Sequence, residues 1–249
     1  MFHVEPRGER VAILRMDDGK VNAMGPAFVE RFPAAWAEAA QGGRAIVLAG
    51  NAKAFCAGLD LKVLPTLEGA QIGRFARAFM GVFHQILEHP RPVVCAWDGP
   101  AMAGGAVLGL CSDLRVATPR ARVGLTEMPV GIPFPEPVID LAMATLPAHE
   151  HGPAILQGIV REGAALAARG WAHEVVPGDQ LLHEAARLAD ELASFNPAAY
   201  REGKLHLRAA PLASFERFAK DGPERWAARM GEPATREAIV SYFARVTRK

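Results

Sequence analysis

The chain has 249 residues, 50% of them hydrophobic, and a formal net charge of +1. This length can bury a sizeable core, while a charge near zero with no block of like charges excludes general attraction to nucleic acid. The longest uninterrupted stretch of apolar residues and glycine, 101–111, is too short for a membrane span, so we expect no membrane partner.

Strands and helices are expected to alternate in the first half of the chain, because short apolar, β-branched runs are separated by apolar residues at helical spacing. This alternation is typical of an α/β domain, in which functional turns lie at strand ends. The strands are expected at 11–15, 44–49, 92–97 and 114–118, and the helices at 26–40 and 70–88.

From about Phe134 the pattern becomes helical, and Pro197 is expected to separate a core of residues 1–195 from a C-terminal helical region of residues 196–249. Helices are expected at 137–145, 162–169, 180–194 and 232–248.

The cysteine pattern and the N-terminus both favour the cytoplasm. Cys56, Cys95 and Cys111 are odd in number and have apolar neighbours, which does not indicate a disulfide framework. The first residues lack a basic region followed by an apolar run, so no secretory signal is expected. Other spacings exclude a metal site, because His149 and His151 do not share a helix face.

Two glycine turns carry the strongest functional signal. The first, KAFCAGLDLK over 53–62, follows the expected strand 44–49, and the second, DGPAMAGGAV over 98–107, follows the expected strand 92–97. Glycine allows the backbone to approach a ligand closely, so two such turns can direct two N–H groups at one oxygen. The sequence therefore predicts an oxyanion hole, with the carboxylate of Glu127 following soon after.

These residues resemble the crotonase superfamily, the enoyl-CoA hydratases and isomerases, most strongly over 54–62, over 99–113 and at the segment GLTE ending in Glu127. The resemblance extends from about Val4 to the C-terminus. It implies a ClpP-like spiral of repeated ββα units, with a C-terminal helical trimerisation region that packs on the core and on neighbouring subunits. It also implies a homotrimer or a hexamer built as a dimer of trimers.

The resemblance implies an acyl-CoA thioester substrate, with coenzyme A as part of the substrate and no other cofactor. The backbone N–H groups of Leu59 and Gly104 would form the oxyanion hole, and Glu127 would be the catalytic acid and base. Apolar neighbours such as Leu125 and Val130 indicate a partly desolvated carboxylate, whose pKa would rise and make it a better base.

Positions around the first turn would bind the substrate by the same resemblance. Lys53 and Lys62 flank the turn where the family contacts the adenine and phosphates of CoA, although each is equally well explained as a surface lysine. Main-chain groups near Ala54 and Ala57 would bind the adenine edge. The other expected substrate-binding residues are Asp60, Leu61, Val107 and Phe134.

Val107 departs from the hydratase pattern. In the family's hydratases a second glutamate lies three residues after the oxyanion-hole glycine, and valine can neither orient a water nor transfer a proton. A single carboxylate still suffices for a 1,3-proton shift, and segment 103–113 looks more like the mitochondrial-type Δ3,Δ2-enoyl-CoA isomerase. Two alternatives stay open: hydration, hydrolysis or another enolate reaction, with Glu136 as a possible second acid, and a non-catalytic acyl-CoA binding protein.

Overall fold

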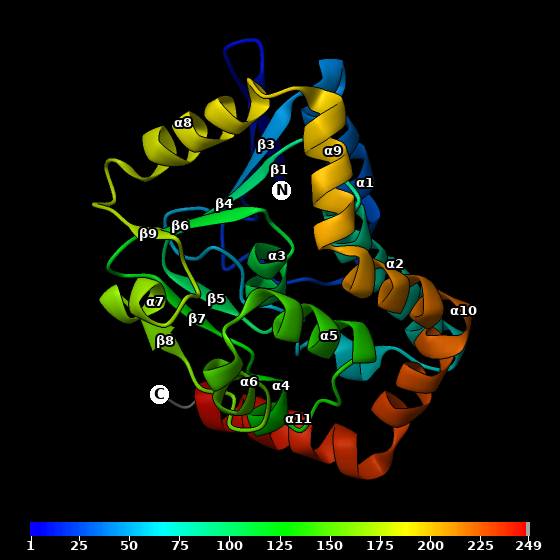
Figure 1. The fold of residues 1–249 in the computed structure, drawn as a ribbon. Helices are drawn as coiled ribbons and strands as arrows, with labels where there is room; N and C mark the ends of the chain where they lie inside the picture. The colour runs from blue at the N-terminus through cyan, green and yellow to red at the C-terminus, as the bar shows by residue number, and fades with distance from the viewer. Residues whose placement is uncertain (248–249) are drawn as a thin grey trace.

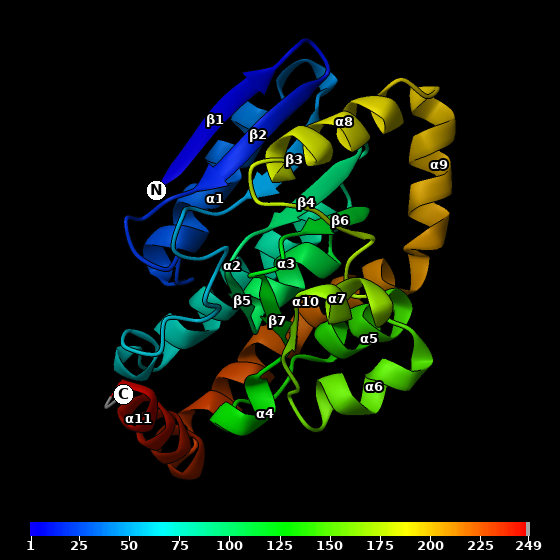
Figure 2. The same ribbon diagram turned by 90° about the vertical axis from the view of Figure 1, so that its left-hand side faces the viewer.

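The chain folds around a mixed sheet, which the computed structural model describes together with the rest of residues 1–247 (Figures 1 and 2). Its strands are β1 (Phe2–Arg7), β2 (Val11–Met16), β3 (Ala45–Ala49), β4 (Val93–Trp97), β6 (Leu114–Ala117) and β9 (Glu174–Val175). The strand order is β1-β2-β3-β4-β6-β9, in which β1 and β2 are antiparallel and every later pair is parallel.

The central strands are apolar throughout because helices cover both faces of the sheet. Val47 and Val94 share one buried cluster with residues of α8 (Leu181–Ala193). Their neighbours Leu48 and Cys95 point the other way, into the larger cluster with residues of α1 (Pro26–Ala39) and α2 (Ala70–Leu87). Alternate side chains therefore fill two separate cores, one on each side of the sheet.

A second, smaller sheet lies beside the first and produces a repeated ββα unit. Its strands are β5 (Pro100–Met102), β7 (Arg122–Gly124) and β8 (Arg161–Glu162), in that order. Thus β4 and β5 lead into α3 (Gly104–Leu110), and β6 and β7 lead into α4 (Glu127–Val130). The helices α5 (Glu136–Thr145), α6 (Ala148–Ile155) and α7 (Ala164–Ala168) complete this part of the chain.

Helices of the C-terminal region pack on the same chain. After α9 (Pro197–Leu207), α10 (Ala209–Gly231) lies against α2 and α5, and α11 (Pro233–Thr247) turns back to reach α4 and the short 3-10 helix Leu64–Thr66 (Figure 2). None of the helices within residues 1–247 has both the length and the apolar character of a membrane span.

The sequence-based prediction of elements is confirmed most closely in the first half of the chain. The four expected strands and the helices at 26–40 and 70–88 are found with ends that differ by one residue or less. Later, the helix expected at 162–169 is wrong at its start, where β8 precedes α7. The helix expected at 232–248 is confirmed as α11, and Arg248 lies outside the described residues. The elements that the prediction missed include β1, β5, α3, α6, α9 and α10.

A buried ionic cluster fastens α9 to the sheet. The carboxylate of Asp113 accepts hydrogen bonds from the Val93 N–H at 2.8 Å, the Tyr200 hydroxyl at 3.1 Å, the Lys204 ammonium at 2.8 Å and the Arg208 guanidinium at 3.1 Å. The side chains of Lys204 and Arg208 are only 3% and 9% exposed. One carboxylate therefore compensates two buried cations.

Asp113→Asn is expected to lower the free energy of unfolding by about 3–5 kcal/mol, because it leaves those two cations without a buried counter-charge. Asp190→Asn is the matched control, since Asp190 pairs with Arg10 at 2.7 Å on the surface and should cost less than about 1 kcal/mol. Urea unfolding of both variants measures the difference. Equal losses of unfolding free energy would show that the buried cluster stabilises the protein no more than a surface ion pair does.

Candidate active site

The sheet brings the two glycine turns together. Because β3 and β4 are parallel neighbours, the chain leaves both strands at the same edge. Beyond that edge the Met102 N–H donates to the Cys56 carbonyl at 3.0 Å, and the Cys56 N–H donates to the Pro100 carbonyl at 3.1 Å. A Cβ at Gly105 would overlap the Cys56 carbonyl, so this contact requires glycine.

The backbone on either side of Leu59 pairs with Met24 and leaves the Leu59 N–H facing away from that pair. The Met24 N–H donates to the Gly58 carbonyl at 2.7 Å, and the Asp60 N–H donates to the Met24 carbonyl at 3.3 Å. In a parallel pair, the N–H of the residue between those two points to the opposite side. Gly104 lies close to the same turn, because its backbone nitrogen is 3.2 Å from the position of a Cβ on Gly58.

The Gly104 N–H is the first of α3 and has no intrahelical acceptor. Within residues 1–247 no hydrogen bond engages the N–H of Leu59 or of Gly104. Ala103, just before Gly104, has a φ of +48°, a region that non-glycine residues rarely occupy. Its N–H donates to the Gly124 carbonyl at 2.8 Å, which holds the strained turn against β7.

Glu127 begins α4, three residues after β7 ends at Gly124. The residue is 6% exposed, and its Oε2 atom has no hydrogen-bond partner among residues 1–247. Burial raises the pKa of the Glu127 carboxyl to about 8, because no nearby cation compensates the desolvation of its charge. With this pKa most of the group is protonated at pH 7, and the ionised fraction that can act as a base grows as the pH approaches 8.

A pocket of about 550 Å³ contains this carboxylate. Glu127 is the one carboxylate among the described residues that line it, and Tyr242 of α11 closes one side from the same chain. The lining residues are Ala57, Leu59, Leu61, Pro100, Met102, Ala103, Arg122, Thr126, Glu127, Val130, Ile132, Val160 and Tyr242.

Comparison with known proteins gives the family. Residues 7–218 match the family described as enoyl-CoA hydratase/isomerase. A putative enoyl-CoA hydratase from Thermus thermophilus is 36% identical over 183 residues, which is 72% of each chain. The chain belongs to the enoyl-CoA hydratase/isomerase family. Its α/β architecture is thus the expected crotonase fold, and its substrate class is the acyl-CoA thioesters.

Solved structures of the family agree. The enoyl-CoA hydratase EchA3 from Mycobacterium ulcerans is 29% identical and aligns with a TM-score of 0.85 over 90% of this chain and 98% of its own. The human mitochondrial Δ3-Δ2-enoyl-CoA isomerase aligns with a TM-score of 0.94 over 99% of this chain and 98% of its own. At 21% identity, the human structure supports the fold alone. Hydratases and isomerases both occur among these relatives, so their names do not decide the reaction.

Of the other residues predicted around the first turn, Ala57 and Leu61 line the pocket that contains Glu127. The Asp60 carboxylate accepts from the Lys62 N–H at 3.0 Å and orders the turn itself. The backbone of Ala54 is already engaged, because its N–H donates to the Asn51 side chain and its carbonyl accepts from the Asn51 N–H.

The two predicted lysines lie at the surface on either side of the turn. The Lys53 ammonium donates to the Gly19 carbonyl at 2.6 Å, and the Lys62 ammonium lies 5.8 Å from the centre of the Phe243 ring on α11. Neither lysine lines the pocket among the described residues, so their contact with CoA stays a prediction.

The structure places the remaining three predicted residues away from the pocket lining. Val107 is 1% exposed within the core on α3, and Phe134 is half-buried against the core. Glu136 begins α5 with its side chain 61% exposed and pairs with Arg225 at 3.5 Å. This position does not fit a second catalytic acid. Among residues 1–247, no group of three or more potential metal ligands is present.

Sequence reasoning missed Tyr242 and Arg122 as pocket residues. Tyr242 carries no local signal, since it reaches the site only because α11 folds back over the pocket. Arg122 is recognisable only after β7 is placed beside β5, where it pairs with Glu162 at 3.3 Å at the pocket's edge.

The stability of the protein is expected to fall as pH rises from about 4.5 to about 8, through the contribution of Glu127. In that range the native carboxyl keeps a proton that the unfolded chain has released, so deprotonation favours unfolding. Glu127→Gln removes this dependence. The wild-type free energy of unfolding minus that of the variant should fall by a few kcal/mol between about pH 5 and about pH 9.

Chemical unfolding of both proteins at the two pH values measures this difference. The pKa values of the buried His89 and of His173, each lowered to about 4 chiefly by desolvation, affect both proteins equally, so their contributions cancel. A difference that does not change with pH would show that the Glu127 carboxyl has an ordinary pKa.

Proposed function

We propose that the protein is an enoyl-CoA isomerase that moves the double bond of a 3-enoyl-CoA to the 2-position. The observation that carries this proposal is the single carboxylate, Glu127, among the described residues lining a pocket bordered by two unpaired backbone N–H groups. Addition of water in this family needs a second glutamate, at the position that Val107 occupies. A proton shift within the substrate needs one base only.

The reaction begins when the Glu127 carboxylate removes a proton from C2 of the thioester. The electron pair of the C–H bond moves into the acyl group, and the negative charge develops on the thioester oxygen. The N–H groups of Leu59 and Gly104 stabilise that oxygen, an effect worth about 3 kcal/mol per donor in other enzymes. The protonated Glu127 then returns the proton at C4, and the double bond comes to rest between C2 and C3.

The pocket favours return of the proton over addition of water. The pocket is lined in part by the apolar side chains of Leu59, Val130 and Ile132, which limit the access of water to a dienolate intermediate. The raised pKa of Glu127, about 8, also makes its carboxylate a stronger base toward the C2 proton than an ordinary carboxylate.

Product analysis tests the proposal. Purified protein is incubated separately with a 3-enoyl-CoA and a 2-enoyl-CoA, and the products are identified by mass. Isomerisation leaves the mass unchanged and gives the same equilibrium mixture from both thioesters, whereas hydration adds the mass of water. A hydrated product, or free CoA from hydrolysis, would replace the proposed reaction with one of the alternatives. Binding without turnover would indicate an acyl-CoA binding protein.

The same proposal includes a homotrimer or a dimer of trimers, and no cofactor apart from the CoA of the substrate. Membership of the family supports both expectations. Light scattering after gel filtration tests the first, and activity of protein dialysed against a chelator tests the second.

A further inference from the structure

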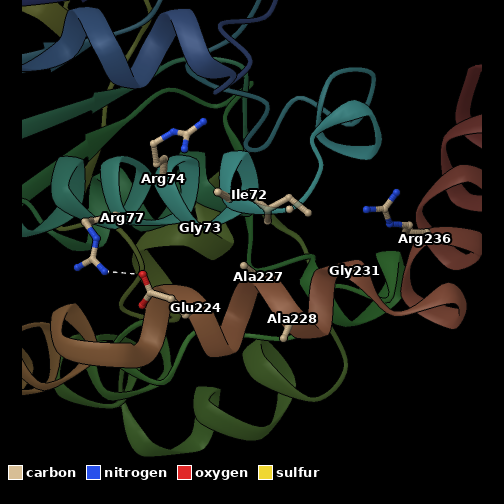
Figure 3. Close-up of a pocket in the computed structure, with 11 residues that line it drawn as sticks. Ile72, Gly73, Arg74, Arg77, Glu224, Ala227, Ala228, Gly231 and Arg236 are labelled. Carbon is tan, nitrogen blue, oxygen red and sulfur yellow. Dashed lines mark hydrogen bonds and ion pairs between the residues drawn. The ribbon is translucent and has the colours of Figure 1, made fainter.

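A second cavity of about 550 Å³ lies between the start of α2, the end of α10 and the start of α11 (Figure 3). It is distinct from the catalytic pocket, with which it shares no lining residue. Its walls combine small or apolar residues with charged ones. The lining residues are Gly69, Ala70, Ile72, Gly73, Arg74, Arg77, Glu224, Ala227, Ala228, Gly231 and Arg236.

The charges in this cavity leave cations in excess. Arg77 is neutralised by Glu224, with 2.6 Å between its guanidinium and the carboxylate. Arg74 and Arg236 have no carboxylate partner among residues 1–247. Figure 3 shows the Arg236 side chain reaching from α11 toward Ile72. In the same view Arg74 projects from the side of α2 that faces away from α10. Arg236 is therefore the cation best placed to meet an anion in the cavity.

The Arg236 guanidinium has a weak internal partner. It donates to the Leu67 carbonyl at 3.4 Å, near the limit for a hydrogen bond. A carboxylate offers the same guanidinium two parallel, charge-assisted hydrogen bonds. The apolar side of the cavity suits a hydrocarbon chain bearing that carboxylate, because a Cβ at Gly73 or Gly231 would meet no atom within 4 Å.

One face of α11 links this cavity with the catalytic pocket. Tyr242 lines the catalytic pocket, Ile239 lies three residues earlier, and Arg236 three residues earlier again. At 1.5 Å per residue, Arg236 is about 9 Å from Tyr242 along the helix axis. Residues three apart are offset by about 60° around a helix, so Ile239 lies between Arg236 and Tyr242, which are about 120° apart. This side of α11 therefore borders both the pocket that holds Glu127 and the cationic cavity.

A small intermediate cavity of about 10 Å³ lies along this path. Ile72 and Arg236 line both this cavity and the large one, and the buried side chains of Leu64 and Ile239, which are 5% and 1% exposed, line the small cavity as well. An acyl chain that followed the path would displace those two side chains.

We propose that Arg236 binds a carboxylate at the far end of the acyl chain, so that the enzyme prefers thioesters of dicarboxylic acids. This inference rests on the proposed acyl-CoA site, and it names the substrate class of that site. An acyl group that ends in a methyl leaves Arg236 to its weak contact with Leu67. An acyl group that ends in a carboxylate completes a charge-assisted pair, which should tighten binding about 10-fold to 100-fold.

Binding of saturated thioesters tests the inference without requiring any reaction. Calorimetry would compare adipoyl-, suberoyl- and sebacoyl-CoA with hexanoyl-, octanoyl- and decanoyl-CoA, each pair having the same chain length. Wild-type protein is expected to bind at least one dicarboxylic thioester about 10-fold more tightly than its partner. Arg236→Gln should remove that preference and leave the binding of the methyl-terminated thioesters unchanged.

Two further variants separate recognition from folding. Arg201→Gln, on the exposed face of α9 and outside the cavity, should keep the preference. Gly73→Leu should also remove the preference by filling the cavity, while preserving the fold because its Cβ meets no atom within 4 Å. Equal weakening of both thioester classes by Arg236→Gln would assign Arg236 a structural role in α11 and overturn the proposal.

Binding of free adipate tests whether the carboxylate in the cavity belongs to a free dicarboxylate rather than to the end of an acyl chain. Adipate that binds wild-type protein but not Arg236→Gln, with no preference between the thioester classes, would assign the cavity to a free dicarboxylate and overturn the acyl-chain source. Turnover is measured separately with 3-enoyl-CoA substrates of both classes. Failure of isomerisation together with an Arg236-dependent binding preference would reject the proposed reaction and retain this inference.

Discussion

Replacing Glu127 by glutamine is expected to reduce the isomerisation rate constant kcat by about 1,000-fold. Glutamine has nearly the same shape as glutamate but can neither remove the C2 proton nor return it at C4. Because no second carboxylate among residues 1–247 lines the pocket, no other acid can take over the role. The loss should appear in kcat rather than KM, since the N–H groups that hold the thioester are unchanged.

Stability separates this loss from misfolding. The Glu127 carboxyl is buried, and its Oε2 atom has no partner among residues 1–247, so exchange for a neutral amide should not destabilise the native protein at neutral pH. Glu136→Gln is the matched control, because that side chain is exposed and outside the pocket. The control should keep its activity within about twofold. Full activity in Glu127→Gln would refute the catalytic role.

Features of the site that depend on residues close together in the sequence could be predicted. The two turns follow apolar strands directly, so the expectation that their N–H groups meet needed only that β3 and β4 be adjacent. The apolar neighbours of Glu127 likewise predicted a desolvated carboxylate, and the structure places it 6% exposed. These predictions rest on local pattern combined with one long-range pairing.

The missed elements have weaker local patterns. Helix α10 buries Phe215, Phe218, Trp226 and Met230 at helical spacing, but Gly222 and Pro223 interrupt the middle of this pattern and indicate a break. The structure tolerates both residues because they are buried against neighbouring elements. A Cβ at Gly222 would strike the Phe218 ring, so packing accounts for glycine at this position.

Tyr242 could not have been assigned to the site from the sequence, because its position depends on the direction that α11 takes after α10 ends. Trp226 of α10 donates to the Pro133 carbonyl at 2.8 Å, and Gly131 has room for Ala238 of α11 only because it lacks a Cβ. These tertiary contacts decide that α11 returns to its own pocket. Neither contact leaves a periodic signal in the sequence.

Gly58→Ala is expected to lower kcat/KM by about 100-fold to 1,000-fold, the effect of losing one oxyanion-hole donor. Gly58 has a φ of +80°, and an added Cβ would lie 2.6 Å from the Met102 carbonyl oxygen and 3.2 Å from the Gly104 nitrogen. Both neighbours are backbone atoms, so relief requires the two turns to separate. That separation moves the Leu59 and Gly104 N–H groups away from a common point.

The effect of crowding can be distinguished from the effect of backbone conformation. Gly42 also has a positive φ, +70°, but a Cβ there would meet no atom within 4 Å. Gly42→Ala should therefore cost about 1 kcal/mol of stability and leave kcat/KM unchanged. If Gly58→Ala lost only as much stability as this control and kept its activity, the close contact of the turns would not position the oxyanion hole. If only Gly58→Ala lost activity, the position of the oxyanion hole would depend on the absence of a Cβ at Gly58, because both variants carry the same conformational penalty.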